Sequence, residues 1–105
     1  MPQILIRNVK QQELETIAEP LVEELAAITG SPEDYFTIEL LHTTVIGKSE
    51  VYPMIQINWF ARAQEVQDDV AASIDRHLRA LGYSQIDVYF VILQEDAYYD
   101  NAIHY

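Results

Sequence analysis

Apolar residues recur along the chain with two different spacings, and each spacing predicts a different kind of element. Short runs rich in β-branched and aromatic residues predict strands at four places, residues 3–8, 35–46, 52–60 and 86–94. Between them, residues 11–29 and 63–81 repeat apolar side chains every three or four positions, which is the pattern of an amphipathic helix. The predicted order of elements is therefore β-α-β-β-α-β.

Glycine and proline mark the ends of these elements. Gly30 caps the first helix, Pro32 prevents its continuation, and Gly82 caps the second helix. A polar turn at 47–50 separates the second and third strands. Pro20 lies inside the first helix, where it predicts either a kink or the start of a second helix.

The two halves of the chain resemble each other. A shift of 51 residues aligns Pro2 with Pro53. A shift of 52 aligns the helix start, the apolar stripe and the capping glycine, pairing Gln12 with Gln64, Ala18 with Val70, Val22 with Ile74, Ala26 with Leu78 and Gly30 with Gly82. We favour a duplication over convergent patterning. The expected organisation is one domain, 1–105, with a repeat of roughly 2–46 and 52–94 and a tyrosine-rich tail, 97–105.

A β-α-β unit joins two parallel strands through a right-handed crossover. Two such units predict an α/β fold, with a four-stranded mixed sheet and both helices on one face. The face expected beneath the helices is nearly all apolar and carries Ile4, Ile6, Phe36, Ile38, Leu40, Ile55, Ile57, Trp59, Val88, Phe90 and Ile92. The opposite face mixes polar and apolar residues, which predicts contact with other subunits of a closed ring. Arg7 and Glu39 form a candidate ion pair on that face.

Composition narrows the functions that such a fold carries. The 105 residues include 17 acidic and 6 basic ones, and the net charge of −11 repels nucleic acid and anionic membranes. There is no cysteine, and no apolar run is long enough to cross a membrane. The amino terminus lacks the features of a signal peptide, so we expect a cytoplasmic protein. The histidines have no ligand spacing, so neither a metal nor another cofactor is expected.

Several motifs resemble one superfamily. Met1-Pro2 before a strand with Ile4 and Ile6, and Thr29-Gly30-Ser31-Pro32 before another strand, resemble the tautomerase superfamily. That superfamily includes oxalocrotonate tautomerases and macrophage migration inhibitory factor. The stretches 52–60 and 62–68 and the segment 98–101 are similar to a small, uncharacterised bacterial domain-of-unknown-function family within it. The likeness covers nearly the whole chain.

The resemblance implies a homotrimer with sites between subunits and Pro2 at the base of each. In that superfamily the amino-terminal proline, freed of the initiator methionine, is the general base of keto–enol tautomerisation. An α-amino group has a pKa near ~8, and an apolar pocket lowers it toward neutrality, where a base is most effective. With Met1 retained, the Pro2 nitrogen is an amide and cannot act as a base.

The expected anion clamp departs from the superfamily pattern. Lys10 is nearest to the arginine that oxalocrotonate tautomerases place after the first strand, and Thr37 or Glu39 stands where they have another. Ser31 stands where macrophage migration inhibitory factor has a lysine. Two alternatives to a tautomerase follow. One is a non-catalytic homo-oligomer that keeps the fold, and the other is a ferredoxin-like ligand-binding domain with a different strand order.

Arg62 is the leading candidate for binding a small carboxylate substrate. It precedes the second helix, whose amino-terminal N–H groups attract anions. The alternative for Arg62 is a surface ion pair with Glu65. Two further basic candidates, two aromatic candidates for an apolar pocket and one amide for an enolate oxygen are Arg7, Lys10, Trp59, Tyr89 and Asn58.

Overall fold

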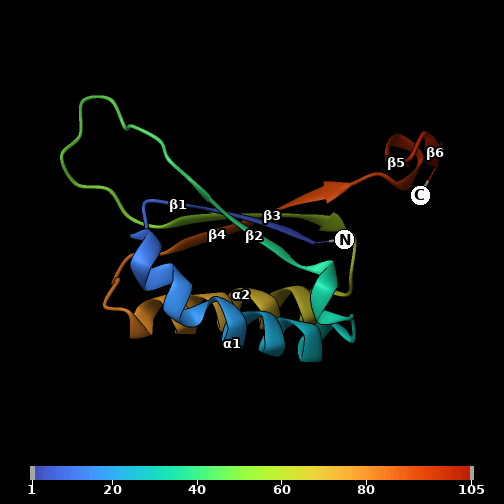
Figure 1. Ribbon diagram of the computed structural model, residues 1–105, viewed down its shortest axis with the longest axis horizontal. Coiled ribbons are helices and arrows are strands. Elements are labelled where there is room, and N and C mark those ends of the chain that lie inside the picture. The colour runs from blue at the N-terminus through green and yellow to red at the C-terminus, as the bar shows by residue number, and fades with distance from the viewer. Residues whose placement is uncertain (1, 105) are drawn as a thin grey trace.

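Figure 1 shows a computed structural model of the protein, which describes residues 2–104, with two helices packed on one face of a sheet. The main elements are β1 (Gln3–Arg7), α1 (Gln11–Thr29), β2 (Thr37–Leu41), β3 (Met54–Phe60), α2 (Gln64–Ala80) and β4 (Asp87–Leu93). Single 3-10 turns, η1 (Glu33–Tyr35) and η2 (Glu95–Ala97), follow α1 and β4. The short strands β5 (Tyr99–Asp100) and β6 (Ile103–His104) form a hairpin that projects away from the sheet (Figure 1).

The four main strands form one mixed sheet in the order β2-β1-β3-β4. β1 is parallel to β2, β3 is parallel to β4, and the central pair of β1 and β3 is antiparallel. Each half of the chain keeps its own two strands adjacent, as a β-α-β unit does. The predicted fold is therefore confirmed, and this strand order excludes the ferredoxin-like alternative.

The two halves repeat the same bonding where their strands begin. The backbone N–H of Thr37 donates to the carbonyl of Pro2 at 3.3 Å, and that of Asp87 donates to the carbonyl of Pro53 at 3.1 Å. Both prolines are fully buried. Proline suits the first position of a strand because it offers a carbonyl to its neighbour while having no N–H to satisfy. The duplication itself stays a prediction.

The core lies between the central strands and the two helices. Its fully buried members include Ile4, Ile6, Leu21, Leu25, Ile55, Ile57, Trp59, Ile74 and Leu78. The outer strands are less completely covered, because two helices side by side do not reach both edges of a four-stranded sheet. Ile38 and Phe90 are therefore only partly buried, and Ile92 is 43% exposed although its position on β4 places it on the inner face.

Some element boundaries differ from the sequence prediction. β2 is shorter than the predicted strand at 35–46, because residues 42–52 leave the sheet as an exposed loop at one end of the molecule (Figure 1). β1 ends at Arg7 because Asn8 adopts a left-handed conformation with φ of 68°. α1 continues through Pro20, whose exposed position tolerates one missing hydrogen bond. Neither helix in residues 2–104 is long and apolar enough to cross a membrane.

Replacing Ile57 with alanine tests the core. Ile57 is 1% exposed and lies in the middle of β3, so Ile57→Ala should lower the free energy of unfolding by roughly 2–5 kcal/mol. Urea unfolding measures the loss. Ile46→Ala is the matched control, since Ile46 is 87% exposed in the loop and should change stability by less than about 0.5 kcal/mol. Equal losses in both variants would contradict this description of the core.

Candidate functional site

Pro2 lies at the amino end of β1, between the ends of two neighbouring strands. In the antiparallel pair of β1 and β3, Gln3 is opposite Asn58. Extending this register by one position places Pro2 opposite Trp59. The Pro2 side chain is less than 2% exposed. The predicted base therefore adjoins the carboxyl end of β3, the strand that leads directly to Arg62.

Trp59 is the centre of an aromatic and cationic stack at this end of the sheet. Its ring stacks on Phe90 of β4, with centroids 4.8 Å apart and planes 25° apart. The guanidinium carbon of Arg62 lies over the Trp59 ring, 5.2 Å from its centroid. Such a cation–π contact holds the Arg62 side chain in place. Arg62 lies in the loop 61–63, which connects β3 to the start of α2.

Two side-chain donors at this stack are buried without a hydrogen-bond partner. They are Nε1 of Trp59 and Nε of Arg62. Arg62 takes part in none of the ion pairs among residues 2–104, so the alternative pairing with Glu65 is not formed in the chain. Ala63, the N-cap residue of α2, provides no side-chain cap either. This end of the molecule thus presents unsatisfied donors and one unpaired positive charge.

A hollow of about 470 Å³ lies at the carboxyl ends of β3 and β4, and neither Trp59 nor Arg62 is among the residues that line it. Its apolar wall includes Phe60 and Ile92, and Ile92 is the residue paired with Trp59 in the register of the two strands. Its polar rim includes Glu95 and Asp96 of the η2 turn. The hollow therefore combines an apolar wall with a negatively charged rim.

Arg7 and Tyr89 lie elsewhere, on the sheet face that the helices leave open. Nη2 of Arg7 donates to the Tyr89 hydroxyl at 3.1 Å, and that hydroxyl donates to Oε1 of Gln56 at 2.9 Å. Nε2 of Gln56 donates to Oδ1 of Asn58 at 2.9 Å, and Nδ2 of Asn58 donates to Oε1 of Gln3 at 3.3 Å. We call these five side chains the open-face ladder. It crosses β1, β3 and β4.

The ladder changes the role expected for Arg7. Among the described residues, Arg7 belongs to no ion pair, so the predicted pairing with Glu39 does not form within the chain. Glu39 is on the edge strand β2, where its register partner is Leu5 of β1. Arg7 instead bonds to Tyr89 of β4, at the other edge of the sheet. The Arg7 guanidinium instead closes a chain of neutral hydrogen-bonding groups.

Lys10 lies beyond the opposite end of β1 from Pro2. Five residues of β1 separate the two ends, a distance of about 16 Å along a strand. The backbone N–H of Lys10 donates to the Tyr83 hydroxyl at 3.2 Å, and that hydroxyl donates to Oε1 of Glu13 at 2.6 Å. Burial, and then the hydrogen bond to the Glu13 carboxylate, raise the pKa of Tyr83 above 10.0.

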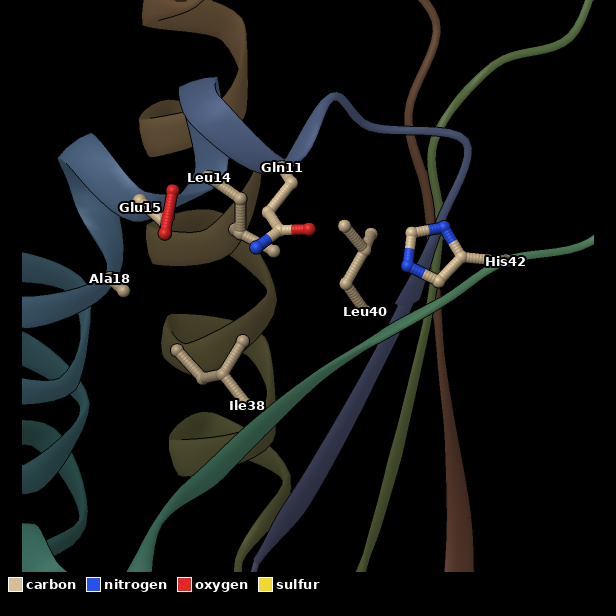
Figure 2. Close-up of a pocket in the computed structure, with 7 residues that line it drawn as sticks. All are labelled: Gln11, Leu14, Glu15, Ala18, Ile38, Leu40 and His42. Carbon is tan, nitrogen blue, oxygen red and sulfur yellow. The ribbon is translucent and has the colours of Figure 1, made fainter.

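A second hollow, of about 330 Å³, lies between α1 and the edge strand β2. Figure 2 shows Leu14 and Ala18 of α1 facing Ile38 and Leu40 across it, with polar side chains at its mouth. The polar members are Gln11, Glu15 and His42. This groove contains none of the residues predicted to bind substrate. Among residues 2–104, no three His, Asp or Glu side chains are placed to hold a metal ion.

The chain thus divides the predicted site residues among three places. Pro2, Trp59 and Arg62 share one end of the sheet, Arg7, Asn58 and Tyr89 belong to the open-face ladder, and Lys10 lies at the far end. Sequence reasoning missed Gln3, Gln56 and Phe90. Alternation was the available signal for the first two, since Gln56 stands two positions from Asn58 and Gln3 stands four positions from Arg7 on the same face.

Comparison with solved structures places this architecture in a known class. A macrophage migration inhibitory factor-like protein from Entamoeba histolytica superposes with a TM-score of 0.77 at 16% identity, covering 99% of this chain and 98% of that one. A fused 4-OT wild-type asymmetric trimer superposes with a TM-score of 0.82 at 12% identity, covering 97% and 94%. The protein has the fold of the tautomerase superfamily.

Within that class, the sequence matches one family over residues 1–104, and the protein belongs to it: the domain of unknown function DUF1904. A DUF1904 protein from Sebaldella termitidis is similar in structure with a TM-score of 0.90 at 28% identity, covering 100% of both chains. No curated protein matches the sequence. The suspected superfamily and family are confirmed, whereas the activity is not assigned by these likenesses.

The partly buried phenol of Tyr83, with its raised pKa, predicts a pH dependence at the alkaline end. Because folding raises the pKa of Tyr83, the folded state favours the neutral phenol. The resulting stability is present below pH ~10 and is lost as pH rises through the folded-state pKa. Tyr83→Phe should therefore lose less stability than the wild type between neutral pH and pH ~11, as measured by urea unfolding at each pH. Tyr35→Phe, at an exposed tyrosine, should keep the wild-type profile. Identical profiles for Tyr83→Phe and wild type would contradict the assignment.

Proposed function

We propose that the protein is a tautomerase-type isomerase that moves a proton on a small carboxylate-bearing substrate in the bacterial cytoplasm. The observation that supports this most directly is the place of Pro2, at the start of a central strand, opposite Trp59 and at the same end of the sheet as the unpaired Arg62. A base and a cation at the same end of the sheet are the minimum that such a reaction needs.

Pro2 takes and returns the proton in this proposal. Its nitrogen is a secondary amine once Met1, which lies outside the described residues, has been removed. The surrounding apolar side chains disfavour the protonated amine, so the nitrogen stays available as a base. Arg62 orients the substrate carboxylate, and its charge also stabilises the electron density that develops on the enolate.

A homotrimer is the assembly that we propose. The open sheet face carries the ladder, whose polar groups already bond to one another, so covering this face leaves few of them unsatisfied. One of the similar structures, the fused 4-OT, is described as a trimer. In such an assembly Arg7, Lys10, Asn58 and Tyr89 reach a substrate only where a neighbouring subunit brings them to the Pro2 end.

The second candidate is a non-catalytic homo-oligomer that keeps the fold. The observation in its favour is the burial of Pro2, whose side chain is less than 2% exposed and whose carbonyl is bonded to Thr37. A proline in that position also serves as an ordinary strand start, as Pro53 does in the second half. Retention of Met1 in the mature protein would favour this candidate.

Replacing each proline in turn separates the two candidates. Pro2→Ala should lower kcat/KM for enol–keto conversion of 2-oxo acids roughly 10²-fold or more, because a positioned general base contributes at least that much. Pro53→Ala is the matched control, since Pro53 has the same burial and backbone bonding but is never an amine. It should keep the wild-type kcat/KM apart from any loss of stability.

Intact mass of untagged protein decides whether this experiment is meaningful. The proposal requires a mass lighter by one methionine residue than that of the full 105-residue chain. A full-length mass, or a demethionylated protein without activity on any enol substrate, would refute the tautomerase proposal and leave the non-catalytic oligomer.

Light scattering in solution tests the assembly. We expect three chains of 12.1 kDa in each particle. Leu5→Arg places a charge at the centre of the open face, where burying an unpaired charge is costly, and should shift the mass toward that of one chain. Ile46→Arg, which adds the same charge to the exposed loop, is the control. A monomeric wild type would contradict the proposed trimer.

A further inference from the structure

We propose that the protein binds a small organic ammonium ion in a hollow at the Pro53 end of the sheet, opposite to the Pro2 end. The hollow has a volume of about 650 Å³, which is within the range of small-molecule sites. It lies between residues 49–53, where the exposed loop returns to the sheet, and residues 82–85, which connect α2 to β4. Figure 1 shows both segments at the same end of the molecule. This site does not depend on proton transfer at Pro2.

Two tyrosines form the aromatic part of the hollow. Tyr52 and Tyr83 both line it. The Tyr52 hydroxyl donates to Oδ2 of Asp87 at 3.2 Å, and the Tyr83 hydroxyl donates to Oε1 of Glu13 at 2.6 Å. A phenol that donates to a carboxylate keeps more electron density on its ring, and the face of such a ring attracts cations. Two rings of this kind at one hollow favour a positively charged ligand.

Hydrogen bonds hold both tyrosines in place within the chain. The backbone carbonyl of Tyr52 accepts from Nδ2 of Asn8 at 2.9 Å, so this residue is fixed at its backbone and at its hydroxyl. The Tyr83 hydroxyl also accepts from the backbone N–H of Lys10 at 3.2 Å. The hydrogen bond to Asp87, and then the charge of that carboxylate, raise the pKa of Tyr52, so its phenol is neutral at pH ~7. Walls that are already in position lower the entropic cost of binding.

The charges around the hollow exclude an anion. Among the described residues that line it, Glu50 is the one ionised side chain, and it joins none of the ion pairs within residues 2–104. Arg79 donates to the Ser84 carbonyl at 2.9 Å, but Asp75 neutralises its charge through two hydrogen bonds. Lys10 lines a neighbouring hollow instead. The uncompensated charge is therefore negative, and it selects a cation.

The cation that fits is organic. A metal ion needs several oxygen or nitrogen ligands, and within residues 2–104 no three His, Asp or Glu side chains are placed to supply them. Aromatic rings beside a carboxylate instead suit a methylated ammonium group, which is large and weakly hydrated. The hydroxyls of Ser49 and Ser84 and the amide of Gln85 line the same hollow and offer polar contacts to the rest of the ligand. The geometry points to an ammonium ion with a short polar arm.

Choline is a suitable probe, and its neutral tert-butyl analogue, in which carbon replaces the nitrogen, is the matched control. Titration of the full chain at low ionic strength, where charges are least screened, is followed by the backbone amide NMR signals. Choline should shift the signals of Gly82 and Ser84 and should saturate. The neutral analogue has the same shape without the charge, and it should bind at least about tenfold more weakly.

Variants then assign the ring and the charge. Tyr52→Leu removes a ring that is 40% exposed, so the fold should persist, and Glu50→Gln removes the charge from the exposed loop. Each should weaken choline binding roughly threefold or more, as expected for a cation–π or ionic contact near solvent. Tyr52→Phe keeps the ring but removes the donation to Asp87, and its affinity should lie between those of the wild type and Tyr52→Leu.

Two control variants make the same changes outside the hollow. Tyr35→Leu and Glu33→Gln alter exposed positions on η1 and should bind choline as the wild type does. Equal affinity for choline and its neutral analogue would overturn the proposal on wild-type protein alone. Equal losses in Glu50→Gln and Glu33→Gln would also overturn it, because they would show that the net charge of −11 attracts the cation and the hollow does not.

Discussion

The register of β1 against β3 determines where everything else in this protein lies. Two neighbouring antiparallel strands bury Ile4 and Ile6 against Ile57 and Ile55 beneath the helices. Because side chains alternate between faces, a slip by one residue would move all four to the open face. The same register sets Pro2 opposite Trp59 and sends Arg7 to the other end and the other face. The hydrophobic core thus fixes the position of the polar chemistry.

Burial also explains why the two faces of the sheet differ in character. The inner side is held mainly by apolar packing, and its exceptions are three buried polar atoms without a hydrogen-bond partner: Nε1 of Trp59, Nε of Arg62 and Oγ of Ser73 on α2. On the open face, the ladder joins five side chains in series, so each of these five has a partner within the chain. A closed ladder of this kind is a surface whose polar groups tolerate being covered.

Sequence periodicity predicted the fold because the spacing of apolar residues differs between strands and helices. The two β-α-β units and the buried face followed from it, and the errors occurred where tertiary context decides. The strand predicted at 35–46 stops at Leu41, where the chain leaves the sheet as a loop. Ile92 is 43% exposed because coverage of an edge strand depends on where the helices lie. Periodicity carries no information on how wide a helix layer is.

The candidate site was only partly predictable. Pro2 and Arg62 were identified from motif and position, and they lie at the same end of the sheet. The partner of Arg7 was predicted wrongly within the chain: Glu39 lies on the strand next to Arg7, whereas Tyr89 is 82 residues away along the chain. A choice between two such partners depends on side-chain reach across the sheet. The lack of a hydrogen-bond partner for the buried Trp59 indole nitrogen depends on what surrounds it, which no spacing reveals.

Pro2 and Pro53 occupy matching places in the two halves, yet a polypeptide has a single amino terminus. Only one of the two places can ever hold a secondary amine, and the other is an amide for the lifetime of the protein. Removal of Met1 would therefore make a chain with two similar halves chemically asymmetric. Proton transfer therefore places no requirement on the residues around Pro53. They are constrained only by packing and by the surface that they form.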